Sequence, residues 1–345
     1  MDQLLKTIIE AAGISGYEKE IADIMYKELK KSCDEVKLDN FGNVIAKKGK
    51  GRKKIMIAAH MDEIGLMVKH ITKEGYLHFI KVGGIDDRVL PAQRVVIKSK
   101  KGDRLGIIGT KPPHLLKEEE KKSAMKYEEM FIDIGCKSRE EAKKTVEVGD
   151  IAVFEPNSGV LNGKLYYGKA IDDRIGCYAL IKIMEKLKVD AEIYAVATGQ
   201  EEVGLKGART AAFNVSPDYA IVIDTTMTGD TPQITERESS MKLGEGVAIT
   251  IIEASGRGVI VNEKMKDLLT DTAGKNKIKY QVGITEGGMT DGAIIYMNKE
   301  GVPTGVLSIP TRYIHSPTGV FNIDDVDAAA KLAIKAIERL AGSPS

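Results

Sequence analysis

The segment Ala191–Gly204, AEIYAVATGQEEVG, constrains this chain more than any other stretch. Ile193–Ala197 is a short, apolar, β-prone run that Gly199 ends, so the sequence predicts a buried strand opening into a loop. The loop carries two adjacent carboxylates, Glu201 and Glu202. Adjacent carboxylates raise each other's pKa unless a cation lies nearby. Because neighbouring residues of an extended segment point to different sides, one of the two can ligate a metal while the other faces a reacting proton.

Taken alone, a pair of glutamates is more often a solvated acidic loop, so the rest of the chain must decide. With 345 residues the chain exceeds one compact domain, and 43% hydrophobic and 29% charged residues are typical of a soluble globular protein. A formal net charge of +1 predicts no nucleic-acid partner and no membrane surface. No apolar run approaches the roughly 20 residues that span a bilayer, and the opening MDQLLKTIIEAAG lacks the pattern of a signal peptide.

Cysteine usage points to the compartment. The three cysteines, Cys33, Cys136 and Cys177, are widely spaced and odd in number. This pattern argues against a disulfide framework or a CxxC zinc knuckle, and we expect a cytoplasmic protein.

Two sequence textures alternate along the chain and predict an α/β protein with an insertion. Residues 1–66 and 159–345 alternate helical patterns with buried-strand runs, and we assign both to one catalytic domain. Residues 67–158 hold many short β-like pieces separated by Gly-rich turns, and we expect them to form an inserted β-rich domain. Helical spacing predicts helices at 3–12, 17–32, 175–187, 207–213, 262–275 and 324–340.

Polar residues stand at the carboxyl ends of several predicted strands. In open α/β sheets such residues meet in one crevice, where ligands bind. A single histidine there would usually be structural, but two histidines with three carboxylates are harder to dismiss. These residues are His60 after KIMIAA, Glu201 and Glu202 after IYAVA, Asp224 after YAIVI, and His315 after VLSI.

These residue types fit a pair of metal ions. Imidazole nitrogens and carboxylate oxygens are the usual ligands of catalytic Zn²⁺, and two metals need a bridging carboxylate. Asp172 in KAIDDR is the candidate bridge, although capping of the following helix is an equally plausible role for Asp172 and Asp173. Asp62, two residues after His60, is placed to hold the other imidazole nitrogen.

Several motifs in this order and spacing resemble the tetrahedral (TET) aminopeptidases, a family of co-catalytic metallo-exopeptidases of which some carry an endoglucanase name. They are HMDEIG, GKAIDDR, GQEEVGLKGA, IDTTMTGD and YIHSP. The likeness extends to GYLHFIKVGGIDDRVLPAQRV in the insertion, which resembles the family's PDZ-like dimerisation domain. The resemblance thus implies a mixed-sheet, zinc-exopeptidase-like catalytic domain and a dodecamer built from dimers.

Transferred position by position, the resemblance implies the composition of the site. Asp172 bridges two divalent metal ions, Zn or Co. His60 and Asp224 complete one metal, while Glu202 and His315 complete the other. Glu201 is implied as the general base and Asp62 as the partner of His60. The Gly-rich segment Glu286–Asp291 resembles a loop near the substrate pocket, but no role for Met289 follows.

We therefore predict hydrolysis of the N-terminal peptide bond of short peptides, by a water held between two metals and deprotonated by Glu201. One alternative is a glycoside hydrolase with two carboxylates, which leaves both histidines and Asp224 unexplained. The other is a non-catalytic peptide-binding shell, which predicts the loss of a ligand position, and none is lost. The sequence fixes neither the preferred N-terminal residue nor the physiological metal.

Overall fold

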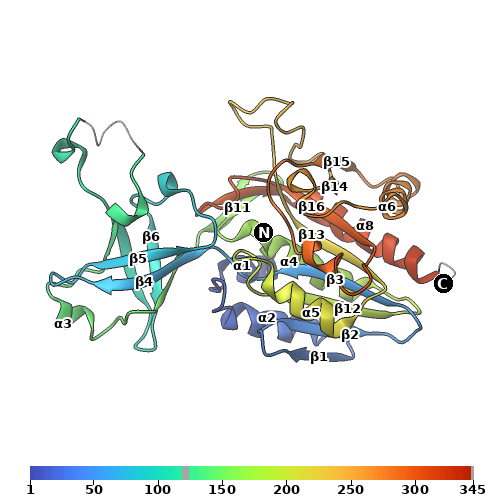
Figure 1. Ribbon diagram of the computed structural model, residues 1–345, viewed down its shortest axis with the longest axis horizontal. Helices are drawn as coiled ribbons and strands as arrows, with labels where there is room; N and C mark the ends of the chain where they lie inside the picture. Colours follow the sequence, from blue (N-terminus) through green and yellow to red (C-terminus); the bar gives the residue numbers. More distant parts are fainter. Residues whose placement is uncertain (119–123, 343–345) are drawn as a thin grey trace.

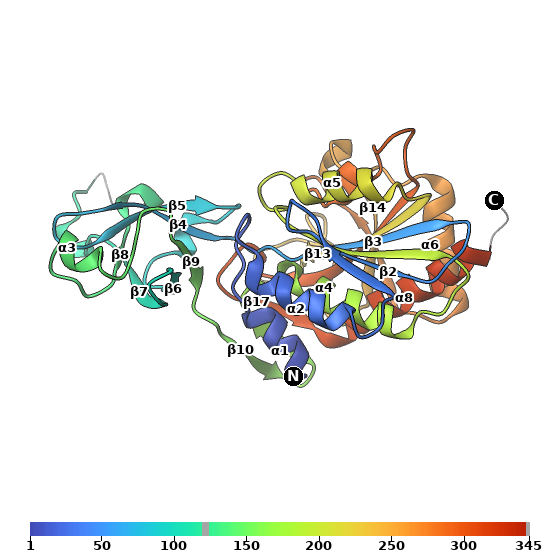
Figure 2. The same cartoon turned by 90° about the horizontal axis from the view of Figure 1, so that it is seen from below.

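The computed structural model describes residues 1–118 and 124–342. A larger α/β part and a smaller β part lie side by side along the longest axis (Figure 1). The N-terminus and the last described helix both lie on the larger part (Figure 2). Among the described helices, none is long and apolar enough to cross a membrane.

The larger part is built on one mixed sheet. Within the described residues it has eleven strands, in the order β1-β2-β12-β3-β13-β16-β17-β11-β10, with β14 paired to β16 and β15 paired to β14. The strands are β1 (Glu35–Leu38), β2 (Val44–Lys48), β3 (Lys54–His60), β10 (Ser158–Asn162), β11 (Leu165–Gly168), β12 (Glu192–Thr198), β13 (Tyr219–Met227), β14 (Val247–Ile252), β15 (Tyr280–Ile284), β16 (Thr304–Arg312) and β17 (Gly319–Asn322).

Four central strands, β12, β3, β13 and β16, run parallel, so their carboxyl ends meet at one edge of the sheet. Thr198 pairs with His60 at that edge. The sequence ended the third of these strands at Ile223, yet β13 continues through Asp224 to Met227. It continues because β16 still offers backbone partners after β3 has stopped pairing at Val222. Asp224 therefore lies inside a strand, on a stretch that β3 leaves uncovered.

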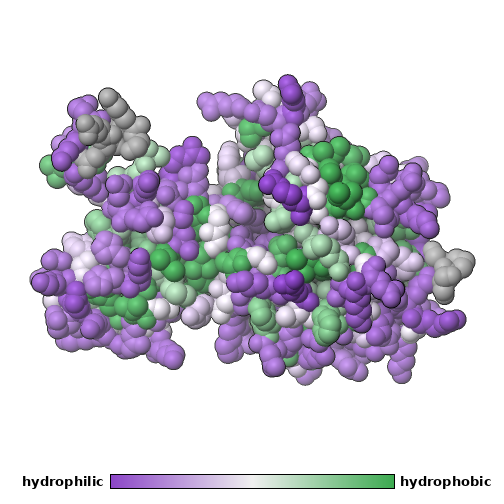
Figure 3. All heavy atoms as spheres, in the orientation of Figure 1, coloured by the Kyte–Doolittle hydropathy of each residue, from purple (hydrophilic) through white to green (hydrophobic). Residues whose placement is uncertain are grey.

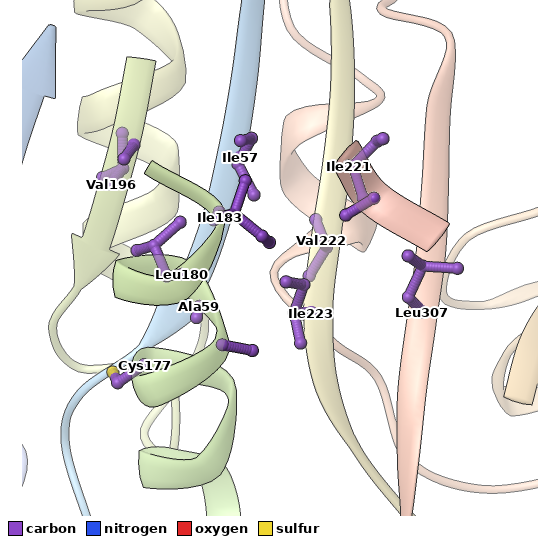
Figure 4. Packing of buried hydrophobic residues seen from close by; sticks show 14 of the residues in the cluster. Ile57, Ala59, Cys177, Leu180, Ile183, Val196, Ile221, Val222, Ile223 and Leu307 are labelled. Carbon is purple, nitrogen blue, oxygen red and sulfur yellow. The ribbon is translucent and has the colours of Figure 1, made fainter. Parts of the chain in front are cut away.

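The core lies between this sheet and the helices, as the apolar runs predicted. Cys177, Leu180 and Ile183 of α4 pack on the sheet (Figure 4). Burying each such aliphatic side chain contributes about 1.5–3 kcal/mol. The helices of this part are α1 (Gln3–Glu10), α2 (Lys19–Leu29), α4 (Ile171–Lys186), α5 (Lys206–Val215), α6 (Glu263–Lys275), α7 (Gly292–Ile295) and α8 (Ile323–Gly342).

The smaller part is a closed antiparallel barrel with its own apolar core. The order of its strands is β4-β5-β8-β7-β6-β9. The sequence predicted many short strands here but not their closure, which depends on pairing β4 with β9 across the whole insertion. Its elements are β4 (Gly65–Ile71), β5 (Leu77–Val82), β6 (Arg94–Lys98), β7 (Arg104–Gly109), β8 (Phe131–Asp133), α3 (Arg139–Ala142) and β9 (Ile151–Phe154).

Candidate metal centre

The residues predicted to form the site do converge at the carboxyl edge of the parallel strands. His60 is the last residue of β3 and is only 2% exposed. Its Nε2 lies 3.1 Å from Asp172 Oδ1 and 3.9 Å from Asp224 Oδ1. His315 follows β16, and its Nε2 lies 3.4 Å from Asp172 Oδ2 and 3.6 Å from Glu202 Oε2. Asp172 thus faces one imidazole with each of its two oxygens.

The two aspartates at the start of α4 have different roles. Asp173 Oδ1 accepts a hydrogen bond from the Gly176 N–H at 3.0 Å, which is a helix-capping contact. Asp172 faces His60 and His315 instead. Burial would raise the pKa of Asp172, but the two imidazoles hold that pKa well below its ordinary value. Asp173, and not Asp172, therefore caps the helix.

Asp173 also approaches the cluster, which the sequence did not predict. Its Oδ2 is buried without a hydrogen-bond partner. Asp173, His60 and Asp224 offer ligand atoms within 4.8 Å of one another, as do His60, Asp172 and Glu202. The only signal in the sequence was the pair of adjacent carboxylates.

Asp62 connects His60 to the loop that carries the two glutamates. His60 Nδ1 lies 3.5 Å from Asp62 Oδ1 and 3.1 Å from the Asp62 carbonyl oxygen. The Asp62 carboxylate also accepts hydrogen bonds from the Glu201 and Glu202 N–H groups, at 3.0 and 3.2 Å, and from Ser15 Oγ at 2.6 Å. Burial would raise the pKa of Asp62, but His60 and these donors lower it. The sequence predicted the contact with His60 but not the others.

The electrostatics of the cluster fit a site for cations. Burial, reinforced by the neighbouring acids, raises the pKa of Glu201 and Asp224 well above the ordinary range, and raises that of Glu202 to about 7. Among the described residues, several buried carboxylates surround two imidazoles, and two carboxylate oxygens, Asp173 Oδ2 and Asp291 Oδ1, are buried without a hydrogen-bond partner. Divalent cations would supply the missing positive charge, and the oxygen and nitrogen donors suit zinc or cobalt.

Asp291, at the start of α7, is a further acid near the cluster. It is 1% exposed, and its Oδ2 accepts a hydrogen bond from Thr198 Oγ1 at 2.5 Å. Burial raises its pKa to about 6. Its charge contributes to the raised pKa of Glu201. The sequence placed Asp291 in the Gly-rich loop without giving it a role.

The cluster opens onto a small cleft. Asp172, Glu202 and His315 lie in its wall, beside the apolar side chains of Ile64 and Ile171. A substrate entering the cleft would meet the predicted ligands directly. A larger groove lies between the β1–β2 turn, α5 and α7, and none of its lining residues belongs to the cluster.

Comparison with known proteins agrees with the fold. The M42 glutamyl aminopeptidase family matches residues 42–332. The lysyl aminopeptidase of Pyrococcus furiosus is 39% identical, over 98% of this chain and 97% of that protein. The TET aminopeptidase of a marine sediment Thaumarchaeota archaeon superposes with a TM-score of 0.95, at 40% identity over 99% of this chain and 96% of that one. The Pyrococcus horikoshii TET1 peptidase, which assembles into a tetrahedron or a large octahedral shell, has a TM-score of 0.87 and 38% identity over 98% of both chains.

The fold and the family match are those of a hydrolase that cleaves peptide bonds. This chain belongs to the M42 aminopeptidase family, whose members are metallopeptidases. The resemblance stated from the sequence motifs is thereby confirmed, as are the fold class and the aminopeptidase activity.

Proposed function

We propose that this aminopeptidase uses two divalent metal ions to release the N-terminal residue of short peptides, with Glu201 as general base. The observation that carries the proposal is that two histidines and several carboxylates converge around Asp172. The proposed ligands are His60, Asp172, Glu202, Asp224 and His315, with Asp173 as an additional donor to the His60 side.

The metal ions and Glu201 have separate tasks. When bound, zinc or cobalt would supply Lewis acidity that acidifies a water and polarises the scissile carbonyl. Glu201 takes the proton from the attacking water and delivers it to the leaving amine. Asp62 accepts a hydrogen bond from the Glu201 N–H, which fixes the loop. Burial, reinforced by Asp224 and Asp291, raises the pKa of the Glu201 carboxyl and so makes it a stronger base.

Glu201→Gln tests this role. The amide keeps the size of the side chain but cannot take a proton, so we expect kcat to fall at least about a hundredfold, in line with general-base catalysis. Metal stoichiometry, measured on the dialysed protein, should stay at the wild-type value because Glu201 is not a proposed ligand. Near-normal turnover by this variant would remove Glu201 from the role.

The activity itself is tested with a peptide panel. We expect cleavage of peptides with free N-termini and not of N-acetylated ones, lost after chelation and restored by zinc or cobalt. Hydrolysis that survives complete chelation would contradict the metal-dependent mechanism. The same panel ranks the residues accepted at the N-terminus.

We further propose that residues 67–158 form a dimerisation domain inserted between catalytic segments 1–66 and 159–345, and that dimers build a dodecamer. The assemblies named for the structural relatives support this. An exposed apolar edge of the larger part supports the assembly of dimers into a larger particle, because hydrophobic surface gathers over β14 and β15 (Figure 3). The cysteines, all present as free thiols, support a cytoplasmic location. Sedimentation velocity of the purified protein measures the assembly directly.

A further inference from the structure

The turn that leaves strand β5 of the barrel lies against the imidazole of His315. A Cβ atom placed on Gly84 would be 3.1 Å from His315 Nδ1 and 3.5 Å from its Cε1. A Cβ atom on the preceding residue, Gly83, would be 3.4 Å from Glu202 Oε2. Two successive glycines therefore let the barrel backbone reach two predicted metal ligands.

This turn is held firmly by its own domain. Lys81 Nζ donates hydrogen bonds to the Ile85 carbonyl at 2.7 Å and to Asp87 Oδ1 at 2.5 Å, so it braces the turn from inside. The ammonium group also lies over the ring of Tyr127, 4.9 Å from its centroid. Ile85 is 5% exposed and belongs to the barrel core. The turn cannot retreat from His315 without disturbing that core.

The connection between β9 and β10 also contacts the loop that carries His315. Asn157 lies between β9 and β10, where the chain re-enters the larger part, and its Nδ2 donates to the Pro317 carbonyl at 3.3 Å. Ser316 Oγ donates within the loop, to the Tyr313 carbonyl at 2.6 Å. The barrel turn and the connection back to the larger part thus both touch the loop, and His315 itself has a φ of +55°.

We propose that Gly84 is a positioning residue for His315. It lets the barrel turn close on the Nδ1 side of the imidazole, so that Nε2 faces Asp172 and Glu202. The φ of Gly84 lies outside the left-handed region, so an alanine there is penalised by the contact with His315 alone. The consequence for metal binding rests on the proposed function, whereas the placement of the imidazole does not.

Gly84→Ala tests the proposal. Its control is Gly274→Ala in α6, where the added methyl meets open space. The first readout is NMR of the histidine imidazoles in the metal-free protein, which has only five histidines, with the His315 signals assigned from their loss in His315→Gln. We expect Gly84→Ala to shift the His315 signals and to lower zinc affinity about 10–100-fold, as a lost orienting contact does. Gly274→Ala should change neither.

The proposal would be overturned if a folded Gly84→Ala protein kept its His315 signals unchanged and bound zinc with an affinity within about twofold of wild type. If that variant does not fold, Lys81→Met tests the same contact, because Lys81 braces the turn that carries Gly84, and unchanged His315 signals there would overturn the proposal too. A wild-type protein that binds no metal and cleaves no peptide would refute the proposed function instead, while shifted His315 signals would still support positioning by Gly84.

Discussion

Asp62 shows what a single residue contributes beyond its motif. Spacing alone indicated that it holds His60, because the two stand two residues apart after a strand. The hydroxyl of Ser15 and the N–H groups of Glu201 and Glu202 come from distant segments, so no local pattern reveals them. The same limit applies to Asp291, which meets Thr198 only after β12 and α7 have packed on one sheet edge.

Thr198 also constrains the protonation of Asp291. Thr198 has a single hydroxyl proton but two acceptors near its Oγ1, Asp291 Oδ2 at 2.5 Å and the Ala59 carbonyl oxygen at 3.3 Å. Both contacts become hydrogen bonds if Asp291 carries a proton and donates it to Thr198 Oγ1. Burial raises the pKa of Asp291 to about 6, even though a hydrogen bond donated by Thr198 would lower that pKa.

Asp291→Asn should therefore stabilise the metal-free protein at high pH. The pKa of the Asp291 carboxyl is higher in the folded protein than in the unfolded chain, where it is 3.8. Its contribution to the free energy of unfolding is therefore complete below pH 3.8 and is lost as the pH rises through about 6. The amide carries no charge to ionise and can donate to Thr198 at every pH. We expect a gain on the order of 1–3 kcal/mol at pH 8 and almost none near pH 4, measured by chemical denaturation.

The matched control is Asp267→Asn, which removes an exposed aspartate from α6. We expect its unfolding free energy to follow wild type at both pH values. A loss of stability at pH 8 in Asp291→Asn would show that the ionised carboxylate is the form that the fold requires.

At the scale of elements, a buried ion cluster locks the segments behind the site together. Lys169 Nζ donates to Glu63 Oε1 at 2.7 Å and to the Ala11 carbonyl at 2.9 Å. Arg174 of α4 donates to the carbonyls of Ile8 and Ala11, at 2.7 and 3.0 Å. The end of α1, the β3–β4 connection and the start of α4 are thus joined through side chains with no exposure above 2%.

Lys169→Met should destabilise the protein by about 3–5 kcal/mol, because it leaves Glu63 buried without its closest cation. Urea unfolding of the metal-free protein measures this. Glu63→Gln in the same chain should recover part of the loss. Lys164→Met is the control, since the Lys164 side chain is 65% exposed and solvent screens its pair with Asp324. Equal losses in the two lysine variants would contradict the assigned role of the cluster.

Most elements of the α/β part could be predicted, because amphipathic spacing and apolar runs are local signals. The helix predicted at 262–275 is α6, and the helix predicted at 324–340 is α8. The continuation of β13 past Ile223 and the closure of the barrel were not predictable, since both depend on partners far away in the sequence. Lys169 and Glu63 stood within recognised motifs, yet their pairing needed the fold.

At the scale of the molecule, β15 is an edge strand with an unusually apolar outer surface. Within the described part of the chain its one strand partner is β14, and Val282 and Ile284 are 48% and 72% exposed. Ile260 nearby is 57% exposed. An apolar edge of this kind invites association, which soluble proteins usually prevent with charges or cover with a neighbour. We infer that another subunit covers it in the assembly.

Ile284→Lys should shift the protein toward smaller species in sedimentation velocity. An unpaired ammonium group in an interface costs on the order of 2–5 kcal/mol per contact. Ile284→Val keeps the apolar character and should assemble like wild type. Identical sedimentation of the lysine variant would place the subunit contacts elsewhere on the surface.

The spacing of the ligands along the chain has a consequence for synthesis. His60 emerges from the ribosome early, whereas His315 emerges only after almost all of the large sheet, including β16, has been translated. A nascent chain therefore presents an incomplete set of donors for most of its synthesis. We expect the metal ions to bind after translation, so that a site occupied by metal is found only in a chain whose large sheet has folded.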